Sequence, residues 1–426
     1  MRRVLATLVA TAAALAGAAP AGAFSEAALQ TTLAREMRLA GPASGAYVRD
    51  LDTGEELFAM RANTARLPAS LQKLYTTSTA LLRFGAHATL DTTVVTRADA
   101  LVDAFGVLHG DLVVVGGGDA FFGDAAATTL ARAVRAAGIR RIAGAVVGDD
   151  SRFDTLRAAR FAGYDPDLGG VLTALAYDRH LFRGRVRLDA GRFAAERFAA
   201  RLRAAGVTPT RRSRAGVAPA ATRTIATVRS RRIGELVRFV NVPSNNFASE
   251  MLLKALGARY RGDGSTRAGA DVVRDTLDDF GVRPRIVDGS GLSRGDRTTP
   301  RQVVQLLERM DGQENARPFR TSLAIPGATG TVKRRMRGTP ARRCRVKTGT
   351  LRDVSALAGY CTTLGDRDVG FALLFNRVSP AAARAIQDRM ATAIARVDED
   401  SDGGGGGGRR GGGDTPGSGG AVPPAG

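Results

Sequence analysis

The sequence predicts an α/β protein in which a sheet with covering helices is interrupted by a β-rich inserted module. Three observations carry this prediction. Strand-like runs lie near both ends of the chain, apolar residues recur at helical spacing between them, and the texture changes over residues 92–222. We therefore expect one domain built from residues 24–91 and 223–398, with the module of residues 92–222 inserted into it.

The first elements are a hairpin and a helix. Residues 46–51 and 56–60 read as strands, and Asp52-Thr53-Gly54 between them supplies a tight turn. After Pro68, a mainly apolar stripe at positions 71, 74, 75, 78, 81 and 82 has the spacing of one helix face. A helix is therefore expected from about Ser70 to Gly85, since glycine commonly ends a helix.

The later elements follow from the same patterns. Short runs such as 112–115 and 145–147 are the expected strands of the inserted module. Helical spacing resumes over residues 233–240 and 246–256, separated by a loop at 241–244. Strand-like runs at 346–348, 354–360 and 369–375 follow. Ser379-Pro380 then begins a last helix, because serine caps helices and proline suits the first turn.

The two ends of the chain are not expected to belong to the fold. Residues 1–23 combine Arg2-Arg3, an apolar Ala-rich run and Ala21-Gly22-Ala23, which is typical of a cleaved secretory signal peptide. The mature protein is thus expected to be exported, in a periplasm or an outer cell wall, without a transmembrane anchor. Residues 399–426 are rich in glycine and are expected to form a disordered tail.

The charge of the chain does not indicate a nucleic-acid-binding protein. Lys and Arg number 62 against 41 Asp and Glu, for a formal net charge of +21, and only four of the basic residues are lysines. The arginines are spread along the whole chain, whereas a nucleic-acid partner would favour one basic face or arm. We expect solubility and a loose attraction to anionic surfaces such as acidic wall polymers or lipid headgroups.

The two cysteines, Cys344 and Cys361, are candidates for a disulfide, because thiols of exported proteins tend to pair. If residues 345–348 and 354–360 form a hairpin centred near Arg352 and Asp353, the two cysteines lie opposite each other. Two buried free thiols are the alternative, because opposed strand positions fit disulfide geometry only in some registers.

Ser70 and Lys73 have the spacing of a nucleophile and its base. Residues three apart share one helix face, so the hydroxyl and the amine lie close together at the first turn. The helix N-terminus favours developing negative charge, and burial lowers the pKa of an amine until it can accept a proton. The simpler explanation of this pair alone is a capping serine and a surface lysine.

Two further short motifs carry polar groups at exposed positions. Ser244-Asn245-Asn246 places a hydroxyl and a carboxamide on an interhelical loop, where helix capping is the simpler explanation. Lys347-Thr348-Gly349-Thr350 lies on an expected strand, and the glycine lacks a side chain where a substrate backbone could approach. The simpler explanation here is a strand that runs into a turn.

Other patterns are set aside. Gly116-Gly117-Gly118-Asp119 resembles a phosphate-binding loop, but no Gly-Lys-Ser/Thr follows it. Ser290 lies between glycines without forming a nucleophile elbow, so its segment is interpreted as a structural loop beside the site. The three histidines have no metal-ligand spacing, which disfavours a zinc peptidase and a Ser-His-Asp hydrolase; we expect no metal and no cofactor.

Together, the three motifs form the set of the serine penicillin-recognising enzymes. The sequence resembles the D-alanyl-D-alanine carboxypeptidases with a large insertion between the first two motifs, the low-molecular-mass class C penicillin-binding proteins of serine peptidase family S13. The resemblance covers nearly all of residues 40–396. It includes Pro68-Ala69-Ser70, Val147-Gly148-Asp149-Asp150, Ser244-Asn245-Asn246-Phe247, Asp288-Gly289-Ser290-Gly291-Leu292-Ser293 and Lys347-Thr348-Gly349-Thr350-Leu351.

The resemblance implies a role for each site residue. Ser70 would attack the carbonyl of the penultimate D-Ala of a peptidoglycan stem peptide, and Lys73 would accept its proton. Ser244 would relay a proton to the leaving D-Ala, and Asn246 would bind the substrate peptide.

The same resemblance places the substrate carboxylate and the oxyanion. Lys347, with the hydroxyls of Thr348 and Thr350, would hold the terminal carboxylate beside Gly349. The backbone N–H groups of Ser70 and Thr350 would form the oxyanion hole. β-Lactams would be covalent inhibitors, and the fold would be the serine β-lactamase and D,D-peptidase sheet flanked by helices.

Three functions remain to be weighed on the sequence. The first is an exported serine D-alanyl-D-alanine carboxypeptidase, for which D,D-endopeptidase activity on cross-links is left open. The second is a serine β-lactamase, which needs fast deacylation and which the long insertion disfavours. The third is a non-catalytic wall-binding protein with the same fold, which the presence of every catalytic residue type disfavours.

Overall fold

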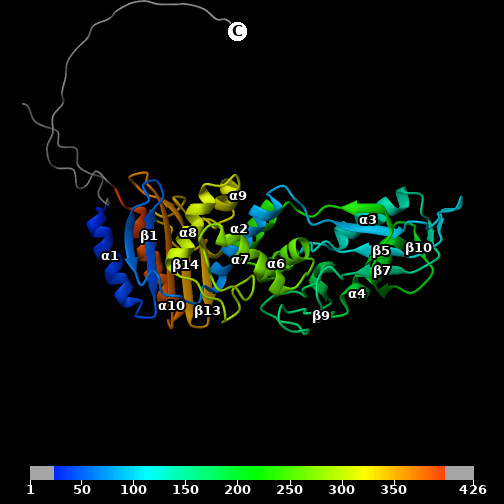
Figure 1. Cartoon of the computed structure of the whole chain (residues 1–426), viewed down its shortest axis with the longest axis horizontal. Coiled ribbons are helices and arrows are strands. Elements are labelled where there is room, and N and C mark those ends of the chain that lie inside the picture. The colour runs from blue at the N-terminus through cyan, green and yellow to red at the C-terminus, as the bar shows by residue number, and fades with distance from the viewer. Residues whose placement is uncertain (1–23, 399–426) are drawn as a thin grey trace, which may run out of the picture.

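A computed structural model describes residues 24–398, so the predicted signal peptide and the predicted Gly-rich tail lie outside the described residues. The molecule is elongated (Figure 1): a domain with a large sheet occupies one end, the inserted module occupies the other, and helices α2 and α6 lie between them. In the described part of the chain no helix is both long enough and apolar enough to cross a membrane.

The main sheet joins strands from both ends of the chain. Its order is β13-β14-β15-β1-β2, and every neighbouring pair is antiparallel. The strands are β1 (Gly45–Asp50), β2 (Glu56–Met60), β13 (Cys344–Leu351), β14 (Val354–Thr362) and β15 (Asp368–Asn376). The expected N-terminal hairpin is present, and β1 pairs with β15 from Gly45–Leu374 to Asp50–Val369.

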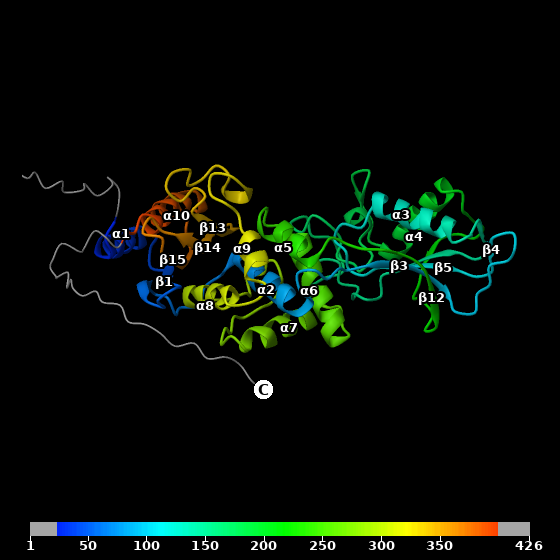
Figure 2. The ribbon, with the colours of Figure 1, turned by 90° about the horizontal axis from the view of Figure 1, so that it is seen from above.

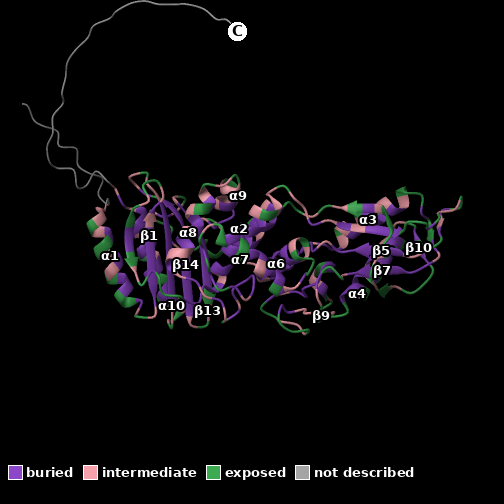
Figure 3. Cartoon of the chain, viewed as in Figure 1, coloured by how far each residue is buried: buried purple, intermediate pink, exposed green. Residues whose placement is uncertain are grey.

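Helices cover both faces of this sheet, which explains why β14 and β15 are buried almost throughout (Figure 3). On one face Phe371, Leu373 and Phe375 contact α1 (Glu26–Leu39) and α10 (Pro380–Ala395). On the other face Ala372 and Leu374 contact the helical cluster around α2 and α8. Alternate side chains of one strand therefore enter two separate cores.

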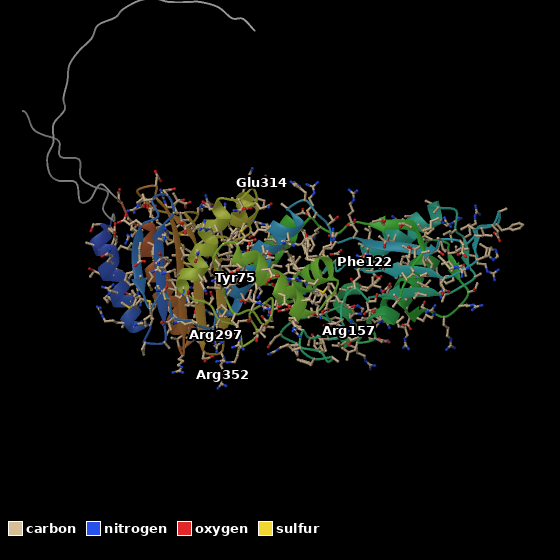
Figure 4. All side chains as sticks on the ribbon, viewed as in Figure 1. Tyr75, Phe122, Arg157, Arg297, Glu314 and Arg352 are labelled. Carbon is tan, nitrogen blue, oxygen red and sulfur yellow. A yellow bond between two sulfur atoms is a disulfide. The ribbon has the colours of Figure 1, made fainter. Side chains whose placement is uncertain are left out.

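The helical cluster lies between the sheet and the inserted module. Its members are α2 (Gln72–Phe84), α5 (Ile233–Asn241), α6 (Asn246–Arg261), α7 (Thr266–Asp278), α8 (Pro300–Asp311) and α9 (Ala316–Thr321). Tyr75 of α2, labelled in Figure 4, is fully buried there, and its hydroxyl lies 2.5 Å from that of Thr298. Ser70 itself lies in a 3-10 turn, Ala69–Leu71, which leads directly into α2.

The inserted module contains more helix than the sequence analysis expected. A five-stranded sheet in the order β11-β7-β5-β3-β12 is covered on one side by α3 (Asp124–Ala136) and α4 (Ala190–Ala204), as Figure 2 shows. The sheet strands are β3 (Thr92–Arg97), β5 (Leu112–Val115), β7 (Val146–Asp149), β11 (Arg214–Ala215) and β12 (Thr222–Val228). The buried faces combine alanine with larger apolar residues, Leu130 and Val134 in α3 and Phe193 and Phe198 in α4, so helical spacing was present in the sequence although strands were expected there.

Short strands complete the module. They are β4 (Val107–Leu108), β6 (Arg141–Ile142), β8 (Leu181–Phe182), β9 (Arg185–Val186) and β10 (Thr208–Pro209). Strand β12 pairs with β3 as far as Val228 with Thr92, so the sheet of the module extends beyond residue 222, where the sequence analysis placed the boundary.

The two cysteines face each other across β13 and β14 and form a disulfide. Cys344 pairs with Cys361 in the strand register, and both side chains are fully buried. The bridge closes a loop of 17 residues between neighbouring strands. In the structure the chain therefore adopts the first of the two alternatives left open by the sequence.

Replacing both cysteines by alanine is expected to lower the free energy of unfolding by about 2–4 kcal/mol, because the unfolded chain regains the freedom of that loop. Urea unfolding of the double variant under non-reducing conditions measures the change. Wild-type protein unfolded in a reductant serves as the control and should match the variant. An unchanged midpoint for the double variant would contradict a stabilising bridge.

Candidate active site

Ser70 is held at the positive end of α2 by a strained turn. Ala69 has a φ of 47°, a left-handed conformation that residues with a side chain adopt only where neighbours enforce it. The Ser70 hydroxyl oxygen lies 2.9 Å from Nζ of Lys73. The nucleophile and its expected base are therefore in hydrogen-bond contact, at a helix end that favours developing negative charge.

Lys73 is fully buried and has three hydrogen-bond partners. Its Nζ contacts Ser70 Oγ at 2.9 Å, Asn246 Oδ1 at 2.7 Å and the carbonyl oxygen of Ser290 at 2.5 Å. The amide and carbonyl oxygens can only accept hydrogen bonds. A neutral amine that donates its two protons to them would direct its lone pair at the hydroxyl of Ser70. Burial lowers the pKa of Lys73 to about 8, which makes this neutral form accessible.

The second motif lies at the N-terminus of α6, and its residues have separate tasks. Ser244 has a φ of 62°, and the side chain of Asn245 caps the helix by accepting a hydrogen bond from Ala248 N. The capping explanation thus applies to Asn245 and leaves Ser244 and Asn246 for other contacts. Asn246 Oδ1 accepts a hydrogen bond from Lys73 Nζ, and Asn246 Nδ2 donates one to the carbonyl oxygen of Asp167 at 2.8 Å.

The third motif lies on the edge strand β13, and its lysine meets the second motif. Lys347 Nζ donates to Ser244 Oγ at 2.8 Å and to the carbonyl of Thr348 at 2.8 Å. Lys347 is fully buried, and burial together with repulsion from Lys73 holds the pKa of Lys347 well below its usual value. The site therefore holds two desolvated amines without a neutralising anion beside Lys347, which suits it to an anionic ligand.

β13 is an edge strand of the main sheet, and beyond Val346 its outer edge is not paired with another strand of that sheet. Val346 exchanges two backbone hydrogen bonds with Ala324, so its peptide groups point away from β14. Since backbone groups alternate along a strand, those of Thr348 and Thr350 point the same way. The N–H of Thr350 is therefore available on the side where Ser70 lies, as an edge strand allows.

Gly349 serves a purpose different from the one expected from the sequence. A Cβ at this position would lie 2.7 Å from the carbonyl oxygen of Pro68 and 3.1 Å from Ser70 N. The missing side chain thus lets β13 approach the turn that carries Ser70, whereas the sequence analysis assigned the space to a substrate backbone.

Three contacts at the site were not found from the sequence. The carbonyl of Asp167 comes from a loop of the inserted module, and the carbonyl of Ser290 comes from a segment interpreted only as lying beside the site. The hydroxyl of Thr331 lies 2.7 Å from that of Thr348. The motif Asp288-Gly289-Ser290-Gly291 gave a signal for Ser290, whereas Asp167 and Thr331 carry no pattern of their own.

The set-aside patterns have structural explanations. A Cβ on Gly116 would lie 2.2 Å from the carbonyl oxygen of Ala174, so close backbone contact explains that glycine. No cluster of metal-ligating side chains is found within residues 24–398.

A cavity of about 950 Å³ lies between α2, α6 and the inserted module, lined by Arg83, Arg152 and Tyr260, and none of the predicted site residues lines it.

Comparisons with known proteins agree with this geometry. The D-Ala-D-Ala carboxypeptidase 3 (S13) family matches residues 25–167 and 170–397. The chain is 30% identical to the D-alanyl-D-alanine carboxypeptidase of Actinomadura sp. (strain R39), over 89% of this chain and 88% of that protein. It is 31% identical to Carboxypeptidase DacB of Mycolicibacterium smegmatis, over 82% of this chain and 79% of that protein.

A solved structure has the same fold. Penicillin binding protein 4 (dacB) from Haemophilus influenzae superimposes with a TM-score of 0.75 and 19% sequence identity, over 85% of this chain and 98% of that one. The fold and the three motifs define a serine D,D-peptidase of the penicillin-binding class. The chain belongs to the D-Ala-D-Ala carboxypeptidase 3 (S13) family and is a serine-type D-alanyl-D-alanine carboxypeptidase, as the sequence predicted.

Proposed function

We propose that Ser70 is the acylated nucleophile, that Lys73 is its base, and that the substrate is a peptidoglycan stem peptide ending in D-Ala-D-Ala. The observation that carries the proposal is the position of the Lys73 amine, which lies 2.9 Å from Ser70 Oγ and is oriented by Asn246 and Ser290. A base in hydrogen-bond contact with the nucleophile, itself oriented by other groups, is the arrangement that nucleophilic catalysis requires.

Acylation follows from this arrangement. Ser70 Oγ attacks the carbonyl carbon of the penultimate D-Ala while its proton moves to Nζ of Lys73. The N–H groups of Ser70 and Thr350 receive the negative charge that develops on the carbonyl oxygen. Ser244 passes a proton to the nitrogen of the departing D-Ala, and the 2.8 Å contact from Lys347 to Ser244 supports that role. Water then hydrolyses the ester and frees Ser70.

The terminal carboxylate is assigned to the third motif. Lys347 carries a positive charge only at a cost while it is buried beside Lys73, and an incoming carboxylate supplies the missing opposite charge. The Thr348 and Thr350 hydroxyls stand on the same strand to donate hydrogen bonds. Asn246, whose Nδ2 is bonded to Asp167 O, would exchange that contact for the carbonyl of the substrate peptide.

β-Lactams are expected to acylate Ser70, because their strained amide and carboxylate present the same groups as the peptide. The Haemophilus influenzae protein has been solved in complex with a β-lactam, which supports this expectation through the shared fold. We also propose that the protein acts outside the cytoplasm, where its substrate lies. The predicted export signal over residues 1–23 supports this location.

Intact mass after incubation with benzylpenicillin tests the proposal. A persistent adduct of one penicilloyl group, mapped by peptide analysis to the peptide containing Ser70, is expected. Release of D-Ala from a pentapeptide and from a cross-linked dimer then measures the carboxypeptidase and endopeptidase rates. Hydrolysis of the drug without an adduct would point to a β-lactamase. Neither adduct nor D-Ala release would point to a wall-binding protein.

A further inference from the structure

A buried segment behind Lys73 fixes one of the three partners of the amine. The carbonyl of Ser290 lies in the segment 287–296, which has no regular secondary structure. The segment also touches the turn of the nucleophile, because a Cβ on Gly291 would lie only 1.9 Å from the carbonyl oxygen of Ala69. How this segment is held therefore decides where the proton acceptor of Ser70 stands.

Three buried carboxyl groups hold the segment by its backbone. Asp288 accepts hydrogen bonds from the N–H groups of Ser290, Gly291 and Ser293, at 3.2, 2.7 and 2.6 Å. Asp296 accepts from Val287 N at 2.7 Å. Glu250 reaches in from α6 and accepts from Gly289 N at 2.9 Å. Each of the three carboxyl-bearing residues is at most 4% exposed.

Glu250 differs from the two aspartates in its place, because it comes from α6 and not from the segment itself. It lies one helical turn after Asn246, so the same face of α6 provides one direct partner of Lys73 and one group behind its other partner. Its second oxygen, Oε2, is buried beside the buried hydroxyl of Ser290, whose side chain lowers the pKa of Glu250. A buried carboxyl with few hydrogen bonds acts strongly on nearby charges, since little else neutralises it.

Lys73 and Glu250 interact electrostatically within a group of buried titratable residues. The charged groups that face this pair are Asp288 and Asp296 from the segment, Lys254 from the next turn of α6, and Lys347 from β13. Lys254 is already bound to Asp154. Asp288, Glu250 and Asp296 all act on Lys73, but burial and the neighbouring Asp288 raise the pKa of Asp296 to about 9, so Asp296 contributes little charge near neutral pH.

We propose that Glu250 is a positioning residue for the reaction, which acts on Lys73 in two ways. It fixes the Ser290 carbonyl through the Gly289 N–H, and its negative charge stabilises the ammonium that forms when Lys73 takes the proton of Ser70. This inference rests on the proposed role of Lys73 as the base. It assigns Glu250 no contact with the substrate.

The direction of the expected effect follows from the charges. Burial lowers the pKa of Lys73 to about 8, while Asp288 and Glu250 oppose that change. Burial and the neighbouring Asp288 raise the pKa of Glu250 to about 7, so its charge changes in the range where Lys73 must lose its proton. Replacing Glu250 with an uncharged residue removes one opposing charge. The pKa of Lys73 then falls, and the neutral amine appears at lower pH.

Glu250→Gln tests the inference, because glutamine keeps an oxygen for Gly289 N but has no charge. The rate of penicilloyl adduct formation at Ser70 is measured from about pH 6 to about pH 10, where the wild-type rate should rise and level off near the Lys73 pKa. The midpoint of Glu250→Gln is expected about one pH unit lower. At the acid end of the range the two rates, each relative to its plateau, should converge, because Glu250 is then protonated in wild type as well.

Two companion variants separate this role from a structural one. Glu250→Asp keeps the charge and should keep the wild-type midpoint, with a lower plateau because the shorter side chain no longer reaches Gly289 N. Glu36→Gln is the matched control: Glu36 is equally buried, on α1, and is bonded to Arg389. It should lower the melting temperature without moving the midpoint.

The outcomes are distinct. A Glu250→Gln midpoint equal to that of wild type, or higher, would overturn the inference while leaving Ser70 and Lys73 in their roles. If Glu250→Gln does not fold, a Glu250→Asp midpoint displaced as far from wild type as one pH unit would overturn it instead. Absence of the adduct in wild-type protein would count against the proposed function and not against Glu250.

Discussion

Ser70→Ala is expected to abolish the penicilloyl adduct and to lower the rate of D-Ala release by about 10⁴-fold or more, since no other group can take the place of the missing nucleophile. Asn246 and Ser290 hold Lys73 independently of Ser70, so Lys73 and the edge of β13 should keep their positions in the variant. The variant should therefore bind the peptide without turning it over, so KM should change far less than kcat.

The matched control for this variant lies two turns along the same helix. Ser78 is fully buried in α2, whereas Ser70 is partly buried in the turn before it, and the Ser78 hydroxyl donates only to the carbonyl of Tyr75. Ser78→Ala should keep both adduct formation and D-Ala release. Adduct formation by Ser70→Ala at the wild-type rate would show that another residue is acylated.

Lys73→Met is expected to slow acylation by about 10³-fold, the usual contribution of a general base in contact with its nucleophile. Methionine has a similar length, so Ser70 keeps its surroundings. Removing a desolvated amine favours the fold, whereas Asn246 Oδ1 and the Ser290 carbonyl lose a donor, which opposes it. These effects offset each other, and the melting temperature should change by only a few degrees.

Another buried lysine provides the control for Lys73. Lys254 on α6 is likewise fully buried, but it is bonded to Asp154 and lies away from Ser70. Lys254→Met leaves that carboxylate without its partner, so it should lower the melting temperature and leave the acylation rate unchanged. Lys73→Met should therefore lose acylation but little stability, and Lys254→Met should lose stability but not acylation. Rates of adduct formation and thermal unfolding of both variants measure these effects. Equal acylation by Lys73→Met and wild type would exclude Lys73 as the base.

The sequence predicted the site better than it predicted its surroundings. Ser70 and Lys73 could be found because residues three apart near a helix start must share a face. Lys347 could be found only through the combined order of the three motifs, because its own pattern is also typical of a strand that runs into a turn. The contacts from Asp167 and Ser290 use backbone carbonyls, which every residue possesses, so only the tertiary fold identifies them.

The helices that the sequence analysis did not identify were missed for reasons that differ from one helix to the next. α8 has a clear start signal, since Thr299 and Gln302 form a capping box around Pro300, and this signal went unused. α1 is capped by Ser25, two residues after the predicted cleavage site, so the signal for its start lies directly beside the predicted export signal. α3 and α4 bury larger apolar side chains as well as alanines, among them Leu130, Val134 and Phe193, and the expectation of a β-rich module left their helical spacing out.

The pairing of β1 with β15 bears on when the protein can become active. The strands of the inserted module lie within one continuous stretch, Thr92–Val228 in outline, so that module can complete its sheet while the rest of the chain is still being made. The main sheet cannot, because β1 must wait for a strand more than three hundred residues later. Lys347, on β13, reaches Ser244 only when that late hairpin docks. A chain whose last strands have not yet been made and folded is therefore an inactive peptidase, and its activity on peptidoglycan begins only when the main sheet is complete.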